Sequence, residues 1–281
     1  MRPLFFLSLF APAFALASAE GVNPKATDLF QFGGIPVSNS ILTTWILAAV
    51  IIIAIRVLIG TPKIVPNKGQ ALVENMASGL RDALEPIVGK SMIGKVFPTL
   101  CGFFIFILLM NWSGLLPGVG TIKYNAEGHW LDAIRPATSD LNTTLALSII
   151  SFVAWTYFVL RYAGFKVLIF DLFGNKADKK ELSTPMWIML SFIFLGVGGI
   201  EVVSIAFRLI SLSFRLYGNV FGGENLIHAL GGIAPYVVPA VAGLLEVLVG
   251  LIQAFVFTLL SAVYIGLICN HEGGHDEEHA H

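Results

Sequence analysis

Residues 186–229 read MWIMLSFIFLGVGGIEVVSIAFRLISLSFRLYGNVFGGENLIHA, a run of 44 residues with only four charged side chains. After a short break, residues 237–268 read VVPAVAGLLEVLVGLIQAFVFTLLSAVYIGLI, a further 32 residues with a single charge. As continuous helices these runs would be roughly 66 and 48 Å long. Both lengths exceed the hydrocarbon core of a bilayer, which is about 30 Å thick. Each helix must therefore tilt steeply, bend or break, and Gly198-Gly199 is a candidate bend.

Three shorter apolar runs precede this pair and are predicted to span the membrane, at residues 41–59, 96–116 and 145–160. Residues 70–88 instead combine apolar side chains at helical spacing with a charged opposite face. This pattern predicts an amphipathic helix, either on the inner membrane surface or packed against partner subunits. The predicted fold class is an all-α polytopic membrane protein with five to six transmembrane helices and an amphipathic surface helix. Its last two helices form a long, steeply tilted hairpin.

The composition supports a membrane protein and excludes other classes. Of the 281 residues, 56% are apolar and only 12% are charged, with a mean hydropathy of +0.81, whereas a soluble domain carries about a quarter charged residues. An ordinary soluble enzyme, a disordered chain and a fibrous protein are therefore excluded. The formal net charge of −1 gives no reason to expect binding to nucleic acid. The two cysteines lie in or next to apolar runs, so no disulfide framework is implied.

Both ends of the chain differ from its membrane-spanning part. Residues 1–19 combine one Arg, an apolar run and a final Ala-Ser-Ala, which predicts a secretory signal peptide; a short first span is the alternative. Residues 20–40 would then be an external N-terminal segment and residues 41–270 the membrane domain. Residues 271–281 are rich in His and acidic residues and are expected to form a disordered cytoplasmic tail. The tail histidines stand four apart, which suits a metal on a helix, but adjacent glycines disfavour a helix there.

The basic residues predict the orientation in the membrane. Residues 62–95 and 161–182 each contain five Lys or Arg, whereas residues 20–40 and 118–141 contain one and two. The positive-inside rule places the two basic loops in the cytoplasm. Five spans that begin outside then leave the C-terminus inside, which agrees with a signal peptide. The predicted location is a bacterial inner membrane, with the N-terminus periplasmic after cleavage.

The hairpin contains charged residues that membrane-spanning segments rarely carry. A charge at the bilayer centre costs at least about 2.5–3.5 kcal/mol on insertion scales, so it is expected to be paired, hydrated or functional. Glu201, Arg208 and Arg215 stand seven residues apart, and their directions around a helix differ by only about 20° per step. These three side chains therefore form one polar stripe, which Asn219 extends by one turn.

The last helix carries a matching polar line. Glu246 and Gln253 are also seven residues apart, and Ser261 lies near the same line. Two facing helices, each with a thin polar line in an apolar body, are typical of routes for ions or protons. The sequence shows no internal repeat of the kind that secondary transporters commonly carry, and no nucleotide-binding, metal-binding or nucleophile–base motif. No cofactor, metal or catalytic site is therefore expected in this chain.

The chain resembles subunit a of F-type ATP synthases in five blocks that follow the family's order. LSFRLYGN at residues 212–219 resembles the family signature, which continues to Gly223-Glu224. The resemblance extends from about residue 40 to residue 268. The other blocks are IEVVS at 200–204, IQAFVF at 252–257, MN through LLP at 110–117, and DLNTTL at 140–145.

The resemblance implies a function in a rotary motor. Subunit a is the stator proton-channel subunit, and it provides two offset half-channels that pass protons to and from the carboxylates of the rotating c-ring. Proton flow is thereby coupled to rotation and to ATP synthesis, whose catalytic sites lie in other subunits. The implied partners are the c-ring, b-type peripheral stalk subunits and the lipid bilayer, with protons as the transported ion.

The resemblance also implies roles for individual residues. Arg215 matches the essential arginine that faces the ring carboxylate, and an arginine keeps its charge in an apolar environment where a lysine can lose it. Asn219 and Gln253 match polar positions near that arginine. The half-channel that opens to the outside is matched by Glu201, Glu224 and Glu246.

Two departures from the family and two rival functions stay open. Many relatives have a histidine at position 224 or 246, whereas this chain has Glu at both. Two nearby carboxylates can share one proton, so a relay is still expected. The second departure is Arg208, which stands where some relatives have Lys-Pro and is expected to face lipid headgroups or a partner. The rivals are a secondary transporter whose Arg215 binds an anionic substrate, and a scaffold that conducts no ions.

Overall fold

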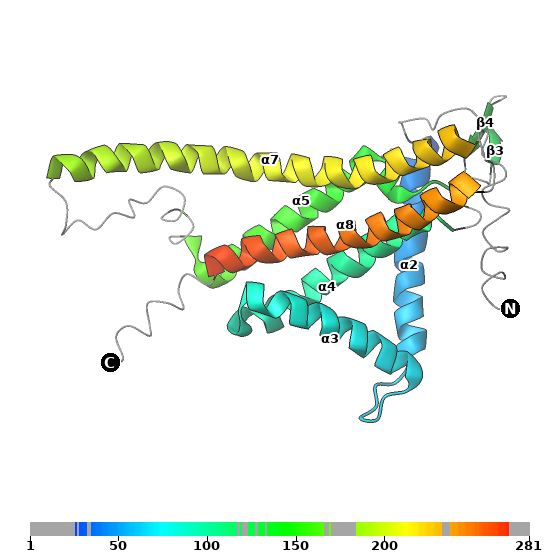
Figure 1. Ribbon diagram of the computed structural model, residues 1–281, viewed down its shortest axis with the longest axis horizontal. Coiled ribbons are helices and arrows are strands. Elements are labelled where there is room, and N and C mark those ends of the chain that lie inside the picture. Colours follow the sequence, from blue (N-terminus) through cyan, green and yellow to red (C-terminus); the bar gives the residue numbers. More distant parts are fainter. Residues whose placement is uncertain are drawn as a thin grey trace.

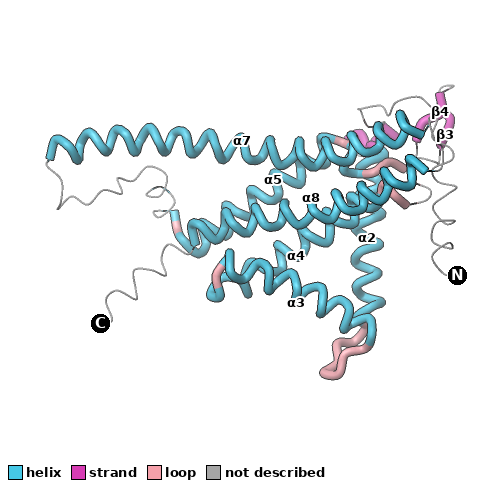
Figure 2. The backbone as a smooth tube through the Cα atoms, viewed as in Figure 1, coloured by secondary structure: helices cyan, strands magenta, loops and turns pink. Residues whose placement is uncertain are grey.

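The computed structural model describes residues 26, 28–32, 35–116, 119, 123–126, 129–132, 134–165, 169, 184–231 and 237–269. Within these residues, five helices are long and apolar enough to cross a membrane, which confirms the predicted all-α polytopic fold. Figures 1 and 2 show how the helices are arranged. They are α2 (Asn39–Ile59), α4 (Lys90–Ser113), α5 (Leu141–Phe158, continued by the π-helical turn Val159–Ala163), α7 (Thr184–Gly231) and α8 (Val237–Cys269).

The helices α7 and α8 form the long hairpin predicted from the two apolar runs. α7 has 48 residues and α8 has 33, and α7 continues as a helix through Gly198-Gly199. Figure 1 shows both helices at a steep angle to α2. Gly198-Gly199 is therefore not a break in α7.

A hydrophobic core forms where α3 (Lys68–Val88) meets α4 and α8. The predicted amphipathic helix packs on the body of the protein through its C-terminal half, whereas Leu72 and Met76 in its N-terminal half stay more than half exposed. The apolar face predicted from the sequence is therefore buried in the C-terminal half of α3 and exposed in its N-terminal half. The buried members of this core include Leu80, Leu84 and Val88 of α3, Ile93, Val96 and Leu100 of α4, and Ala262 and Ile265 of α8.

Gly266 allows α8 to approach the C-terminal end of α3 closely. A Cβ atom at Gly266 would collide with the main-chain carbonyl oxygen of Ile87 and would lie 3.3 Å from the Cα atom of Val88. A backbone carbonyl cannot move aside as a side chain can. The contact between α3 and α8 therefore depends on the absence of a side chain at position 266.

A second hydrophobic core attaches α7 to the other helices near Arg215. Ser213 Oγ also donates a hydrogen bond of 3.2 Å to Thr144 Oγ1 of α5, and both residues are fully buried. The segment of α7 around Arg215 is thus held by apolar contacts and by a polar one. The buried members of this core are Phe103, Ile107 and Leu108 of α4, Leu147 of α5, Leu212 and Leu216 of α7, and Ala254 and Phe257 of α8.

Within the described residues, two small antiparallel strand pairs lie outside the helices, and the sequence patterns had not indicated them. Ser38, at the end of the first hairpin, caps α2 because its Oγ accepts a hydrogen bond from Ile41 N at 3.4 Å. The predicted signal peptide (1–19) and the predicted tail (271–281) lie outside the described residues. The hairpins consist of β1 (Asp28–Phe32) with β2 (Ile35–Ser38) and of β3 (Lys123–Ala126) with β4 (His129–Asp132).

Candidate functional site

The contact between α7 and α8 brings polar residues of the two helices together. Asn219 Nδ2 donates a hydrogen bond to Gln253 Oε1 at 3.0 Å. Gln253 is only 4% exposed, and buried amides of this kind are normally hydrogen-bonded. The two polar lines, which the sequence placed on separate helices, therefore meet at this pair, one turn beyond Arg215 on α7.

Glu246 of α8 lies against α7 at Gly223, the residue before Glu224. A Cβ atom at Gly223 would lie 3.0 Å from Glu246 Oε1 and 3.2 Å from its Cδ. The missing side chain at position 223 thus makes room for the carboxylate. Because α7 and α8 are antiparallel, the contact of Gly223 with Glu246 lies about one turn beyond the Asn219–Gln253 pair along α7.

Glu201 is not part of this group. It precedes Arg215 by 14 residues, whereas Glu224 follows Arg215 by nine, and all three stand on one unbroken helix. Glu201 and Glu224 are therefore roughly 34 Å apart along the helix axis. Along α7, Glu201 therefore lies on the other side of Arg215 from Glu224. A seven-residue spacing places residues on one face of a helix, but it does not place them at one level.

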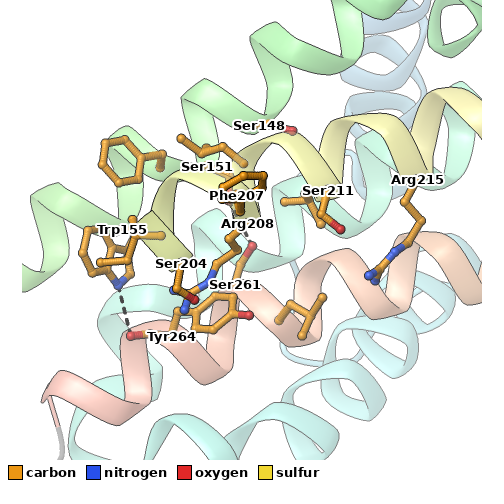
Figure 3. A pocket seen from close by; sticks show the side chains of 15 residues that line it. Ser148, Ser151, Trp155, Ser204, Phe207, Arg208, Ser211, Arg215, Ser261 and Tyr264 are labelled. Atoms are coloured by element: carbon orange, nitrogen blue, oxygen red, sulfur yellow. Dashed lines mark hydrogen bonds between the residues drawn. The ribbon is translucent and has the colours of Figure 1, made fainter. Parts of the chain in front are cut away.

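A cavity of about 320 Å³ lies between α5, α7 and α8 (Figure 3). Arg208 and Arg215 both line it, and none of the described residues that line it is acidic. A water molecule occupies about 30 Å³ in the liquid, so the cavity has room for several. The remaining polar side-chain groups are the indole N–H of Trp155 and the hydroxyls of Ser148, Ser151, Ser204, Ser211, Ser261 and Tyr264.

Arg208 stacks on the ring of Tyr264 inside this cavity. Its Cζ atom lies 3.2 Å from the ring centroid, which is a cation–π contact. Figure 3 shows Arg208 beside Tyr264. The expectation that Arg208 faces headgroups or a partner is therefore wrong, because the side chain is directed into the protein.

Most of the serines that line the cavity were missed by the sequence reasoning, although a signal was present. Ser204 stands four residues before Arg208, and Ser211 stands four residues before Arg215. Each serine is thus one turn from an arginine of the polar stripe. Serine is common in membrane-spanning helices, so this spacing alone did not single the two residues out.

Metal binding finds no support in the described part of the chain. No group of three or more His, Cys, Asp or Glu side chains is arranged there to hold a metal ion. The histidines of the C-terminal tail lie outside the described residues. The chemistry of the described site is thus that of two arginines, several hydroxyls, an amide pair and carboxylates.

The fold and the site define a polytopic membrane protein with a polar seam between two long, inclined helices. A family model described as ATP synthase A chain matches residues 41–266. "ATP synthase subunit a 2" of Bradyrhizobium sp. strain BTAi1 is 31% identical over 241 residues, which are 86% of this chain and 93% of that relative. "ATP synthase subunit a" of Moorella thermoacetica is 29% identical over 241 residues, 86% of this chain and 95% of that relative.

The chain belongs to the ATP synthase A chain family, the family of subunit a of F-type ATP synthases. It is therefore a multi-pass subunit of the membrane sector, where it assembles with other ATP synthase subunits. Family membership disfavours the secondary transporter as a rival function.

Proposed function

We propose that this subunit provides two offset half-channels that pass protons to and from the carboxylates of a rotating c-ring, and so couples proton flow to rotation and ATP synthesis. One observation carries the proposal: Arg215 stands between two polar regions of the α7–α8 hairpin. On one side are the Asn219–Gln253 pair and Glu246. On the other side is the hydroxyl-lined cavity that contains Arg208.

The outer half-channel, in this proposal, uses Glu224 and Glu246 to take up protons. Two nearby carboxylates can share one proton, which suits a relay. Asn219 and Gln253 lie between these acids and Arg215 along the hairpin, and their hydrogen bond orients both amides. These amides orient Arg215 or the passing ring carboxylate.

The inner half-channel, in this proposal, is the cavity between α5, α7 and α8. Water in the cavity and its hydroxyl groups carry the released proton toward the cytoplasm. Glu201 belongs to this side, because it precedes Arg215 on α7 and stands seven residues before Arg208 on the same face of the helix. The proposal therefore keeps Glu201 in the proton route and moves it from the outer half-channel to the inner one.

Arg215 has two functions in this arrangement. Its permanent charge attracts a ring carboxylate that has lost its proton, and this attraction is stronger in the low dielectric of a membrane interior than in water. The same charge repels a proton that would otherwise pass directly from one half-channel to the other. Proton flow is then possible only with rotation of the ring.

The surroundings of the subunit follow from the same proposal. Its partners are the c-ring, b-type peripheral stalk subunits and the lipid of a bacterial inner membrane. Residues 1–19 are removed as a signal peptide, residues 20–40 are periplasmic, residues 41–270 form the membrane domain and residues 271–281 are a cytoplasmic tail. The basic loops at 62–95 and 161–182 support this orientation.

Changing Glu246 to Gln tests the outer half-channel. The amide keeps the shape of the side chain beside Gly223 but cannot carry a proton, so we expect proton pumping to slow by about tenfold or more. The measurement is ATP-driven pumping, over a range of pH, in membranes that contain the whole complex. Asp82→Asn, an equivalent change on the exposed side of α3, should leave the rate unchanged. An unchanged rate and pH profile for Glu246→Gln would remove this residue from the route.

Filling the cavity tests the inner half-channel. Ser211→Leu should displace water from the cavity and lower the pumping rate by about fivefold or more, because a proton route needs a continuous chain of water or hydroxyl groups. Ser211→Ala removes the same hydroxyl without filling the space, so we expect a smaller loss. The comparison uses the pumping rate per assembled complex. Equal rates for the Leu variant and the native subunit would exclude this cavity as the inner route.

A further inference from the structure

Among the described residues, side-chain hydrogen bonds attach α8 to α4 and α5 at four points. Three of them end on main-chain carbonyl oxygens of α8, and the fourth joins two hydroxyls. The bonds are Trp112 Nε1 to Val247 O at 3.1 Å, Asn111 Nδ2 to Gly250 O at 3.2 Å, Trp155 Nε1 to Tyr264 O at 3.1 Å (Figure 3), and Ser151 Oγ with Ser261 Oγ at 3.0 Å.

The four attachment points lie on one face of α8 and at two levels. Val247 and Gly250 form the first level, and Ser261 and Tyr264 form the second level 14 residues further along. Eleven residues are close to three full turns, so Gly250 and Ser261 have nearly the same direction. The two levels are roughly 21 Å apart. Gln253 lies between them, and Glu246 lies directly before the first.

Bonds to the main chain restrain α8 in a way that contacts between side chains do not. A carbonyl oxygen moves only with the whole helix, and its second lone pair can accept a bond in addition to the one within the helix. The indole of a tryptophan is rigid, so its N–H holds that carbonyl at one height. The bond from Asn111 is buried, so no water competes for its donor, whereas the bond from Trp112 is exposed.

The first level also lies at a close approach of two helices. A Cβ atom at Gly250 would lie 3.1 Å from Asn111 Cβ and 3.3 Å from Trp112 Cδ1. The glycine therefore lets α4 bring both donors to the α8 backbone. Asn111 is only 2% exposed, so its bond to Gly250 O is enclosed by protein.

We propose that Asn111, Trp112 and Trp155 are positioning residues that fix the height of α8 along its axis. The fixed height keeps Gln253 level with Asn219 and Glu246 level with Gly223 while the rotating ring exerts force on the hairpin. The inference rests on the proposed function, because it assigns a load and an alignment to that same site. It adds residues of α4 and α5 that do not carry protons themselves.

The test removes the two indole donors and measures the height of α8 directly. Trp112→Phe and Trp155→Phe, together and singly, keep an aromatic ring and lose the N–H. Each variant also carries Cys101→Ser and Cys269→Ser, which remove the native thiols. One of two cysteine pairs is then introduced. The first pair is Asn219→Cys with Gln253→Cys, and the second is Asn219→Cys with Val249→Cys, one turn away on α8. The ratio of disulfide formed by the two pairs in the assembled complex reports on the height of α8, and it does not depend on how much complex is present.

In the double Phe variant we expect the ratio to shift toward the pair one turn away by about threefold or more. Without the cysteine pairs, pumping per assembled complex should fall by a similar factor, since small misplacements of reacting groups have large effects on rate. The single variants should shift the ratio less, and they provide the test if the double variant does not assemble. Trp45→Phe, in an exposed tryptophan of α2, is the matched control and should change neither measurement.

An unchanged ratio in both the double and the single variants would overturn the positioning proposal, whatever the pumping rate. Arg215→Ala, measured in parallel, separates this failure from a failure of the proposed function. If Arg215→Ala stops pumping while the ratio is unchanged in the Phe variants, only the positioning proposal fails. If Arg215→Ala pumps normally, the proposed function itself is wrong.

Discussion

Replacing Arg215 with Ala should abolish ATP-driven proton pumping in membranes that contain the whole complex. The residue stands on α7 between the Asn219–Gln253 pair and the cavity, so its charge is the barrier between the two proposed half-channels. Without it, a ring carboxylate loses the partner that favours release of its proton. We expect a loss of at least about 100-fold, in the range that removal of a positioned charge from a reaction site produces.

Passive proton leak provides an independent measurement for the same variant. Because the barrier between the half-channels is gone, Arg215→Ala membranes should leak more than native membranes. Arg56→Ala, in the last turn of α2 where the side chain is exposed, removes an arginine outside the site and should pump normally. Normal pumping by Arg215→Ala would contradict the proposed function, whereas lost pumping with normal assembly would exclude a scaffold that conducts no ions.

Replacing Gly266 with Val should prevent the subunit from accumulating in the complex. A side chain at this position collides with the carbonyl oxygen of Ile87 and is tightly packed against Val88 Cα. α3 would have to separate from α8 and expose the core that they share with α4. Overpacking usually costs about 1–3 kcal/mol through side-chain adjustment, and the cost here should be at or above the upper end because the obstacle is main chain.

The amount of subunit in the purified complex measures this effect. Gly102→Val is the matched control, because a Cβ atom at Gly102 of α4 has no neighbour within 4 Å. We expect the control to assemble and Gly266→Val to be depleted by about tenfold or more, as for a change that removes several kcal/mol of stability. Normal amounts of the Gly266→Val subunit would contradict the packing of α3 on α8. The Arg215→Ala variant should thus assemble but not pump, whereas the Gly266→Val variant should fail to assemble.

The hairpin was predictable because the length of an apolar run can be read directly from the sequence. Runs of 44 and 32 apolar residues are too long for a bilayer in any upright arrangement. The facing polar lines were also predictable, since a spacing of seven selects one helix face. Asn219 and Gln253 do meet.

Other features depend on which helices are neighbours, and periodicity along one helix contains no such information. Arg208 turns inward because Tyr264 of α8 offers its ring face. Glu201 is separated from Glu224 by the length of an unbroken helix, whereas a break at Gly198-Gly199 was still open from the sequence. The donors Trp112 and Trp155 bind main-chain carbonyls, and every residue has a carbonyl, so no sequence pattern marks the acceptors.

The close contact of Gly223 with Glu246 also constrains how this protein can evolve. A side chain at position 223 would occupy the space that the Glu246 carboxylate fills, with Oε1 only 3.0 Å from the first added carbon. Substitution at either position therefore changes what the other can accept. Among related sequences, residues larger than glycine at the first position should coincide with shorter or differently directed side chains at the second. Positions 223 and 246 should therefore show correlated substitutions, although they lie on different helices.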